Sequence, residues 1–172
     1  HHCVADVLVR HEYGELNASV LAVVSNHRDL ERLVRRFDVP FHHVPAEGIT
    51  REAHEAALQQ VLEGYAPEYL VLAKYMRVLG GGFVSRYPHR IINIHHSFLP
   101  AFAGARPYQQ AFDRGVKVIG ATAHFVTEVL DGGPILVQQV INVDHTRTPA
   151  DLQQAGRDVE QLVLARAIKL VF

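Results

Sequence analysis

Short apolar runs of strand length alternate with segments of helical periodicity along the 172 residues, and this alternation constrains the fold more than any other feature. Some runs, such as residues 69–73, are apolar on both faces, which is typical of strands inside a parallel sheet. Strands separated by helices predict an α/β fold: an open, mostly parallel twisted sheet with helices on both faces and right-handed crossovers. The predicted strands are residues 19–26, 40–45, 69–73, 90–95, 117–126 and 134–143, and the predicted helices are residues 3–9, 29–37, 51–65, 83–87, 107–114 and 148–170.

Residue types suited to helix starts mark two of these helices. Asn26 is placed to begin the helix at residues 29–37. Thr148 can cap the last helix, where Pro149 suits the first turn and Asp151 complements the helix dipole. The glycines at residues 80–82 lack the Lys and Ser or Thr of a nucleotide-binding loop and predict a flexible turn.

The charge balance excludes several classes of partner. The chain has 17 Lys and Arg against 18 Asp and Glu, so its charge favours neither nucleic acid nor a membrane surface. No apolar run approaches the roughly 18 residues that span a bilayer. Cys3 is the only cysteine, which excludes a disulfide within the chain and favours a reducing compartment. We therefore expect a cytoplasmic protein that binds a small molecule, as a homo-oligomer, with no nucleic-acid or membrane partner.

Polar side chains follow the apolar start of the predicted strand at residues 90–95. Asn93 and His95 are two apart, so they leave the strand on one face, while Ile92, Ile94 and His96 leave on the other. Ligands of open α/β sheets bind outside the carboxyl ends of strands. An amide beside an imidazole could stabilise an oxyanion and move a proton. The alternative is that Asn93 satisfies a loop backbone and His95 is a half-buried, hydrogen-bonded histidine.

A carboxylate, Asp131, lies in the sequence LDGGP between the last two predicted strands. Asp-Gly and Gly-Gly tolerate positive φ, so this sequence is also compatible with a simple turn. Its functional interpretation depends on the strands being neighbours, which would bring Asp131 to Asn93 and His95.

The histidines also raise the possibility of a metal site, but the motifs for one are absent. HExxH does not occur, and the adjacent pairs at 42–43 and 95–96 point to opposite faces of a strand, which makes a poor chelate. No P-loop and no GxGxxG occurs either. We expect no metal.

Two stretches carry a family resemblance. NIHHSFLPAFAGARPY (residues 93–108) and HFVTEVLDGGPI (residues 124–135) resemble the formyltransferase-fold family that uses 10-formyltetrahydrofolate, whose motif is Asn-x-His on a strand plus an Asp in an Asp-x-Gly-Pro loop. The His-His-Ser form is similar to the deformylase branch, whereas glycinamide ribonucleotide transformylases usually have His-Pro-Ser. AKYMRVL (residues 73–79), PAFAGARPY (residues 100–108) and GRDVE (residues 156–160) agree with the deformylase branch too.

The resemblance implies a function and a site. It implies hydrolysis of 10-formyltetrahydrofolate to tetrahydrofolate and formate, which would supply formate to one-carbon metabolism and purine biosynthesis, with no cofactor beyond that substrate. It implies catalytic roles for Asn93, His95 and Asp131. It also implies that the folate-binding residues are Met76, Arg77, Val78, Leu79, His124, Thr127, Glu128 and Leu130.

The resemblance covers residues 1–172 as a single formyltransferase-like catalytic domain, and it also implies what precedes that domain. Deformylase relatives begin with a small ACT-like regulatory domain and a first strand, so we expect this chain to be a fragment that lacks both. Two other functions remain open. One is formyl transfer to an amine acceptor, as in glycinamide ribonucleotide transformylase, and the other is a folate-binding regulator without turnover, which would not need Asn93, His95 and Asp131 together.

Overall fold

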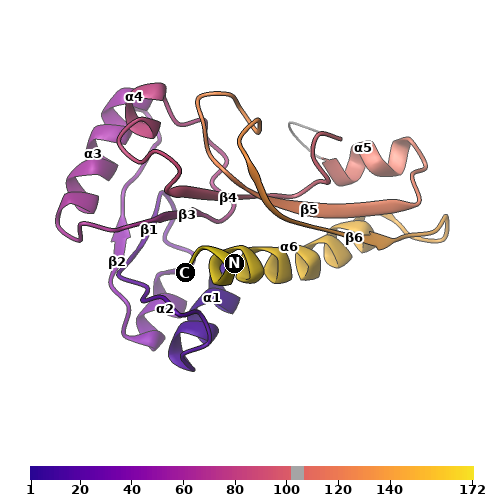
Figure 1. The fold of residues 1–172 in the computed structure, drawn as a ribbon, viewed down its shortest axis with the longest axis horizontal. Coiled ribbons are helices and arrows are strands. Elements are labelled where there is room, and N and C mark those ends of the chain that lie inside the picture. The colour runs from indigo at the N-terminus through magenta and orange to yellow at the C-terminus, as the bar shows by residue number, and fades with distance from the viewer. Residues whose placement is uncertain (102–106) are drawn as a thin grey trace.

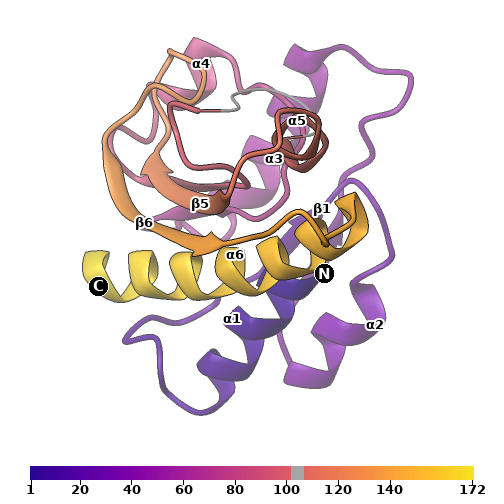
Figure 2. The same ribbon diagram turned by 90° about the vertical axis from the view of Figure 1, so that its right-hand side faces the viewer.

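In the computed structural model, which describes residues 1–101 and 107–172, the chain forms two β-sheets with helices on both sides (Figures 1 and 2). A two-stranded parallel sheet pairs β1 (Val23–Ser25) with β2 (Phe41–His43). A four-stranded sheet has the order β3 (Leu70–Leu72), β4 (Ile91–His95), β5 (Val118–Phe125) and β6 (Ile135–Asn142). The helices are α1 (His2–Glu12), α2 (Glu31–Val34), the 3-10 helix η1 (Arg35–Phe37), α3 (Arg51–Glu63), α4 (Gly81–Val84), α5 (Pro107–Asp113) and α6 (Pro149–Val171).

The α/β class and the helices on both faces are confirmed, and the larger sheet is mixed. β3 and β4 run parallel, whereas β5 is antiparallel to both β4 and β6. The connection between β5 and β6, residues 126–134, contains no helix, and such direct connections join antiparallel strands. The predicted parallel pairing therefore holds within the two pairs β1–β2 and β3–β4, which belong to separate sheets, and fails for β5 and β6. The expectation of a preceding strand and domain stays a prediction.

Local sequence explains most helix boundaries. Thr148 accepts a hydrogen bond from the Asp151 amide, and the Asp151 carboxylate accepts one from the Thr148 amide, so α6 begins with the predicted cap as a full capping box. The prediction for Asn26 is wrong, because the N-cap of α2 is Leu30. The triplet at residues 80–82 is not a simple break either, since α4 begins at Gly81.

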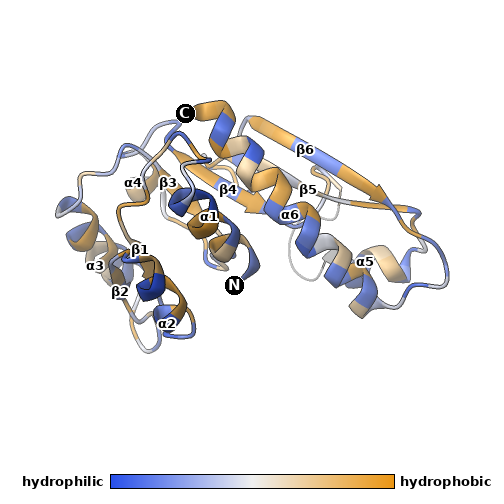
Figure 3. Cartoon of the chain, turned by 90° about the horizontal axis from the view of Figure 1, so that it is seen from below, coloured by the Kyte–Doolittle hydropathy of each residue, from blue (hydrophilic) through white to orange (hydrophobic). Residues whose placement is uncertain are grey.

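The residues of β4 divide the core into two sides. Ile92 and Ile94 pack against α6 in a cluster that includes Val163 and Leu164. Ile91 lies on the opposite side, in a cluster with Phe83, Tyr87 and other apolar residues around α3 and α4. Bands of hydrophobic and hydrophilic residues alternate along α6, as expected of a helix with one buried face (Figure 3). The predicted alternation is confirmed for residues 91–95, so Asn93 and His95 are on the side away from α6. It fails at His96, which follows β4 and whose ring lies against that of His95, with centroids 5.4 Å apart.

Among the helices of residues 1–101 and 107–172, none combines the length and the apolar character needed to cross a membrane.

Candidate active site

Strand pairing brings four polar side chains to one face of the sheet. Asn93 of β4 lies opposite His124 of β5, and His95 lies opposite Thr122. Side chains directly opposite each other on antiparallel strands are close enough to interact. Ala121 and Ala123, which alternate with Thr122 and His124, pack in the α6 core instead. The polar face therefore follows from the alternation of β5 as much as from that of β4.

The connection between β5 and β6 places Asp131 over this face. A hydrogen bond joins the two ends of this connection: the Phe125 amide donates to the Pro134 carbonyl at 2.9 Å. A Cβ on Gly133 would lie 1.8 Å from the Phe125 carbonyl oxygen, so glycine is required there. Asp131 itself has φ +52°, in the left-handed region that Asp and Asn tolerate better than most residues. A turn residue thus also supplies the carboxylate of the site.

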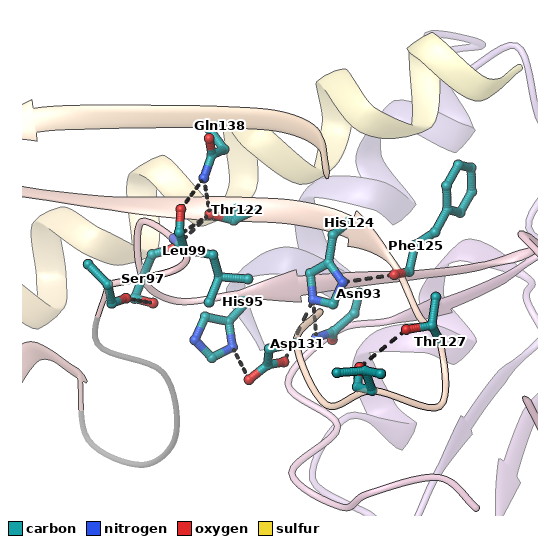
Figure 4. A network of polar contacts seen from close by, with 12 residues as sticks. Asn93, His95, Ser97, Leu99, Thr122, His124, Phe125, Thr127, Asp131 and Gln138 are labelled. Carbon is teal, nitrogen blue, oxygen red and sulfur yellow. Dashed lines mark hydrogen bonds and ion pairs between the residues drawn. The ribbon is translucent and has the colours of Figure 1, made fainter. Parts of the chain in front are cut away.

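The Asp131 carboxylate lies between two imidazoles (Figure 4). Its Oδ2 is 3.4 Å from His95 Nδ1, and its Oδ1 is 3.7 Å from His124 Nε2. The side chains of His95, His124 and Asp131 are only 7%, 2% and 12% exposed, so the contacts are poorly screened by water. The predicted convergence of Asn93, His95 and Asp131 is confirmed, with His124 as a fourth member.

His124 orients Asn93. The Phe125 carbonyl lies 2.9 Å from His124 Nδ1, so this nitrogen carries the proton and donates it. The other ring nitrogen, His124 Nε2, lies 3.3 Å from the Asn93 Nδ2 amide nitrogen and can accept one of its N–H groups. The second N–H of that amide remains to be donated elsewhere. His124 was expected to bind substrate, which stays a prediction; within the protein it contacts Asn93, the Phe125 carbonyl and Asp131.

Thr122 anchors the loop that follows β4 (Figure 4). Its hydroxyl donates to the Ser97 carbonyl at 2.8 Å and accepts from the Leu99 amide at 3.1 Å. Gln138 of β6 donates to both the Thr122 hydroxyl and the Leu99 carbonyl. Thr122 and Gln138 were not among the predicted site residues. The position of Thr122, two residues before His124 on one strand, places both side chains on the same face.

The residues predicted to bind folate lie in two neighbouring segments. One segment follows β3, and the other connects β5 to β6. The two segments are close to each other, because a Cβ built on Gly81, just after the first segment, would lie 3.2 Å from the carboxylate of Glu128 in the second. Met76, Val78 and Leu130 are exposed apolar side chains, at 71%, 53% and 64%. Arg77 and Glu128 are exposed too, Thr127 is half-buried, and Leu79 packs instead with the Phe83 cluster.

A large cavity lies elsewhere in the part of the chain that the structure describes. It has a volume of about 600 Å³ and is lined mainly by apolar side chains of β1, α3 and β3. Leu79 is the one predicted folate-binding residue in its lining, which contains none of Asn93, His95 and Asp131. We place the candidate site at the polar cluster, because titratable groups converge there and the cavity walls are largely apolar.

Among the described residues, His2, Cys3 and Glu160 form a group with the spacing of metal ligands, their donor atoms within 4.8 Å of one another. The group is poorly suited to a metal. Lys74 Nζ lies 3.0 Å from the Glu160 carboxylate and neutralises it. Burial and the Glu160 charge raise the pKa of the Cys3 thiol to about 12, which keeps it protonated. We interpret this group as a buried ion-pair network.

Comparisons with known proteins agree on one family. The family model described as formyl transferase matches residues 1–168. A formyltetrahydrofolate deformylase of Haemophilus influenzae is 57% identical over 98% of the chain and 61% of its own length. The crystal structure of a formyltetrahydrofolate deformylase from Pseudomonas syringae has a TM-score of 0.95 at 45% identity, covering 98% of this chain and 56% of that one.

Transferases share the fold. The crystal structure of glycinamide ribonucleotide transformylase 1 from Symbiobacterium toebii has a TM-score of 0.91 at 36% identity, over 98% of this chain and 81% of that one. The chain thus spans about three fifths of the length of the curated deformylases that it matches and a larger share of this transformylase.

Proposed function

Because this chain belongs to the formyl transferase family, we propose that it hydrolyses 10-formyltetrahydrofolate to tetrahydrofolate and formate, the reaction that the name of its deformylase relatives describes. The observation that carries the proposal is the convergence of an amide, two imidazoles and a carboxylate at the end of β4. Hydrolysis of a formamide needs an activated water on one side of the carbonyl carbon and donors for the developing oxyanion on the other, and the cluster offers both.

We assign the activation of water to Asp131 together with His95. The carboxylate would orient a water molecule and accept its proton as the water oxygen bonds to the formyl carbon. Asp131 Oδ2 is 3.4 Å from His95 Nδ1, within reach of proton exchange after a small movement. His95 could then deliver a proton to N10 of the folate as the C–N bond breaks, since a positioned imidazole can act as a general acid. The products are formate and tetrahydrofolate.

Asn93 is proposed as the oxyanion donor. One of its amide N–H groups is directed to His124 Nε2, which fixes the plane of the amide. The other N–H can donate to the formyl oxygen as that oxygen becomes negative. A donor that is held in place before the reaction costs no reorganisation, and the loss of one such donor typically raises the barrier by about 3 kcal/mol.

The folate would bind across the two neighbouring segments beside Asp131. Exposed apolar side chains are common singly, but Met76, Val78 and Leu130 lie on two segments that meet near Glu128, and a folate ring would cover them. Arg77 would provide a directional polar contact. Arg77→Ala should therefore weaken folate binding in a direct titration, and an unchanged affinity would remove Arg77 from the proposed site.

Formyl transfer to an amine is the second candidate, since a transformylase with a TM-score of 0.91 shares the fold. Water requires no binding pocket of its own, whereas an amine acceptor does. The higher identity to deformylases, 57% against 36%, favours water.

One experiment separates these functions. The protein is incubated with 10-formyltetrahydrofolate, with and without glycinamide ribonucleotide, and both formate and formylated amine are measured. Formate release in the absence of amine supports the hydrolase. Formylated amine with no formate would establish the transferase instead, and folate binding with neither product would indicate a non-catalytic regulator.

We further propose that the enzyme is cytoplasmic, needs no cofactor beyond its folate substrate and forms a homo-oligomer. The buried free thiol of Cys3 supports a reducing compartment. β6 is an outer strand of its sheet, with Ile135 and Val140 at 50% and 43% exposure, and such an edge is suited to a second copy. Sedimentation of the purified protein tests the assembly, and activity after exhaustive chelation tests the absence of a metal.

A further inference from the structure

A second polar cluster surrounds Glu160, on the α6 side of the sheet. Glu160 is fully buried, and its carboxylate accepts hydrogen bonds from His2 Nε2 at 2.7 Å and from the Tyr108 hydroxyl at 2.6 Å. Lys74 Nζ lies 3.0 Å away. These donors and the lysine charge lower the pKa of Glu160 to about 2, although burial alone, the largest single effect, acts to raise it. The carboxylate therefore remains charged, with its oxygens already bonded inside the protein.

The cluster joins one residue from each of the three segments quoted above as agreeing with the deformylase branch, and none of these three residues has been given a role so far. Lys74 comes from AKYMRVL, Tyr108 from PAFAGARPY and Glu160 from GRDVE; residues 102–106 of the second segment lie outside the described residues. Gly156, one helical turn before Glu160, makes room for the contact. A Cβ at Gly156 would lie 2.0 Å from the Tyr108 hydroxyl oxygen.

A row of rings links this cluster to the candidate active site. The Tyr108 ring lies against His96, with centroids 5.9 Å apart, and the His96 ring lies against His95, with centroids 5.4 Å apart. Both distances are in the range of interacting aromatic rings. His95 is in turn 3.4 Å from Asp131. His96 directly follows His95, the last residue of β4, so a displaced His96 ring would also displace the His95 ring that lies against it.

We propose that Glu160 and Tyr108 are positioning residues for His95: Glu160 fixes the Tyr108 ring through its hydroxyl, and that ring holds His96 against the His95 imidazole. The inference rests on the proposed function only for its kinetic readout. It assigns Glu160 no contact with substrate, because its carboxylate is buried and bonded to His2, Lys74 and Tyr108.

A purely structural role for the cluster makes a different prediction. It would lower the stability of variants and leave the turnover of the remaining folded enzyme unchanged. A positioning role lowers kcat in folded protein and leaves folate binding intact, because a misplaced reacting group costs far more in the transition state than in the ground state.

The experiment uses three variants and a matched control. Tyr108→Phe removes the hydrogen bond to Glu160 and keeps the ring, Tyr108→Leu removes both, and Glu160→Gln removes the charge. The control is Tyr65→Phe, because Tyr65 also bonds a histidine, His42 Nε2 at 2.6 Å, with ring centroids 5.4 Å apart, and has no contact with the active-site cluster.

We expect kcat for formate release to fall about tenfold in Tyr108→Leu and Glu160→Gln and by a smaller factor in Tyr108→Phe, with KM changed by less than about threefold. Tyr65→Phe should match the wild type. Wild-type kcat in folded Tyr108→Phe and Glu160→Gln would overturn the proposal. If Tyr108→Leu does not fold, these two milder variants decide.

The imidazole resonances of His95 give a readout that does not depend on the reaction. They are assigned in histidine-labelled protein by comparison with His95→Ala. Their ¹⁵N shifts should move in Tyr108→Phe and Glu160→Gln and stay in place in Tyr65→Phe. If the wild type releases no formate, the proposed function fails by itself, and unmoved His95 resonances would then overturn the positioning role.

Discussion

Asp131 Oδ2 lies 3.4 Å from His95 Nδ1, although His95 ends strand β4 and Asp131 lies in the connection between β5 and β6. The contact depends on two local features: a left-handed backbone at Asp131, and a loop base at which only glycine fits beside the Phe125 carbonyl. The carboxylate is thus held at the imidazole by the backbone, which makes its chemical role separable from its structural one.

Replacing Asp131 by Asn should abolish formate release and leave folate binding nearly intact. The amide has the size of the carboxylate and tolerates the same positive φ, but it cannot accept a proton from water. We expect single-turnover formate production to fall by at least about 100-fold. Asp144→Asn, at an exposed turn where Asp144 accepts from Thr146, is the control. Near-normal turnover in Asp131→Asn would leave Asp131 as a turn residue only.

Asn93→Ala should lower kcat by about 10² to 10³ without a comparable change in KM, because an oxyanion donor acts mainly in the transition state. Asn142→Ala, at the exposed end of β6, provides the comparison. Steady-state kinetics on both variants test the assignment. A rise in KM alone would make Asn93 a substrate-binding residue.

Leu130→Ala should weaken folate binding. The leucine is 64% exposed, and folate bound over it would bury apolar area worth about 1–2 kcal/mol, so KM should rise roughly 5- to 30-fold with kcat little changed. Leu170, at the end of α6, is 63% exposed and gives a control of the same chemistry. Equal behaviour of the two alanine variants in a folate titration would place the folate elsewhere.

His96 should make folding pH-dependent. Burial is the main reason that its pKa falls from 6.5 to about 4, and the nearby Lys74 charge adds to the effect. Between these two values the unfolded chain binds the proton and the folded protein does not, so stability is lost as the pH falls through this window. The urea midpoint should decrease less from about pH 7 to about pH 5 in His96→Asn than in the wild type. In the control His145→Asn, at an exposed position, the urea midpoint should decrease as much as in the wild type. If the midpoint of His96→Asn depends on pH as the wild type does, the pH dependence does not come from His96.

Two glycine-to-alanine changes should have opposite signs. Gly156→Ala places a methyl group against the Tyr108 hydroxyl and should lower the free energy of unfolding by about 1–3 kcal/mol. A Cβ on Gly82, in α4, meets nothing within 4 Å, so Gly82→Ala should raise that free energy by up to about 1 kcal/mol. Chemical denaturation measures both, and stabilisation by Gly156→Ala would contradict the described packing at Tyr108.

Much of the fold could be predicted from the sequence, because apolar spacing determines which elements form. Helix α6 and its cap at Thr148 were predicted, as was the face shared by Asn93 and His95. The direction in which strands pair was not predicted, because the apolar runs at residues 117–126 and 134–143 are compatible with parallel and with antiparallel pairing. The N-cap of α2 is Leu30 instead of Asn26, and Leu30 packs in an apolar cluster with Val34 that the sequence does not reveal.

The candidate site was predicted in part, and the missing residues share a cause. The family resemblance, now confirmed, identified Asn93, His95 and Asp131, and their distances agree with a shared site. Glu160 could not be recognised, because its partners His2, Lys74 and Tyr108 are far away in sequence. An acidic residue in a helix normally faces water, and only the folded chain shows this one to be buried.

The pairing of Asn93 with His124 and of His95 with Thr122 makes the site all-or-none. Side chains alternate along a strand, so a slip of one residue between β4 and β5 would present isoleucine where the site has asparagine and histidine. Such a slip would turn Asn93 and His95 away from His124 and Asp131. Enzyme activity would therefore report on strand register during refolding: it should return only with the final pairing, after helix content has already recovered.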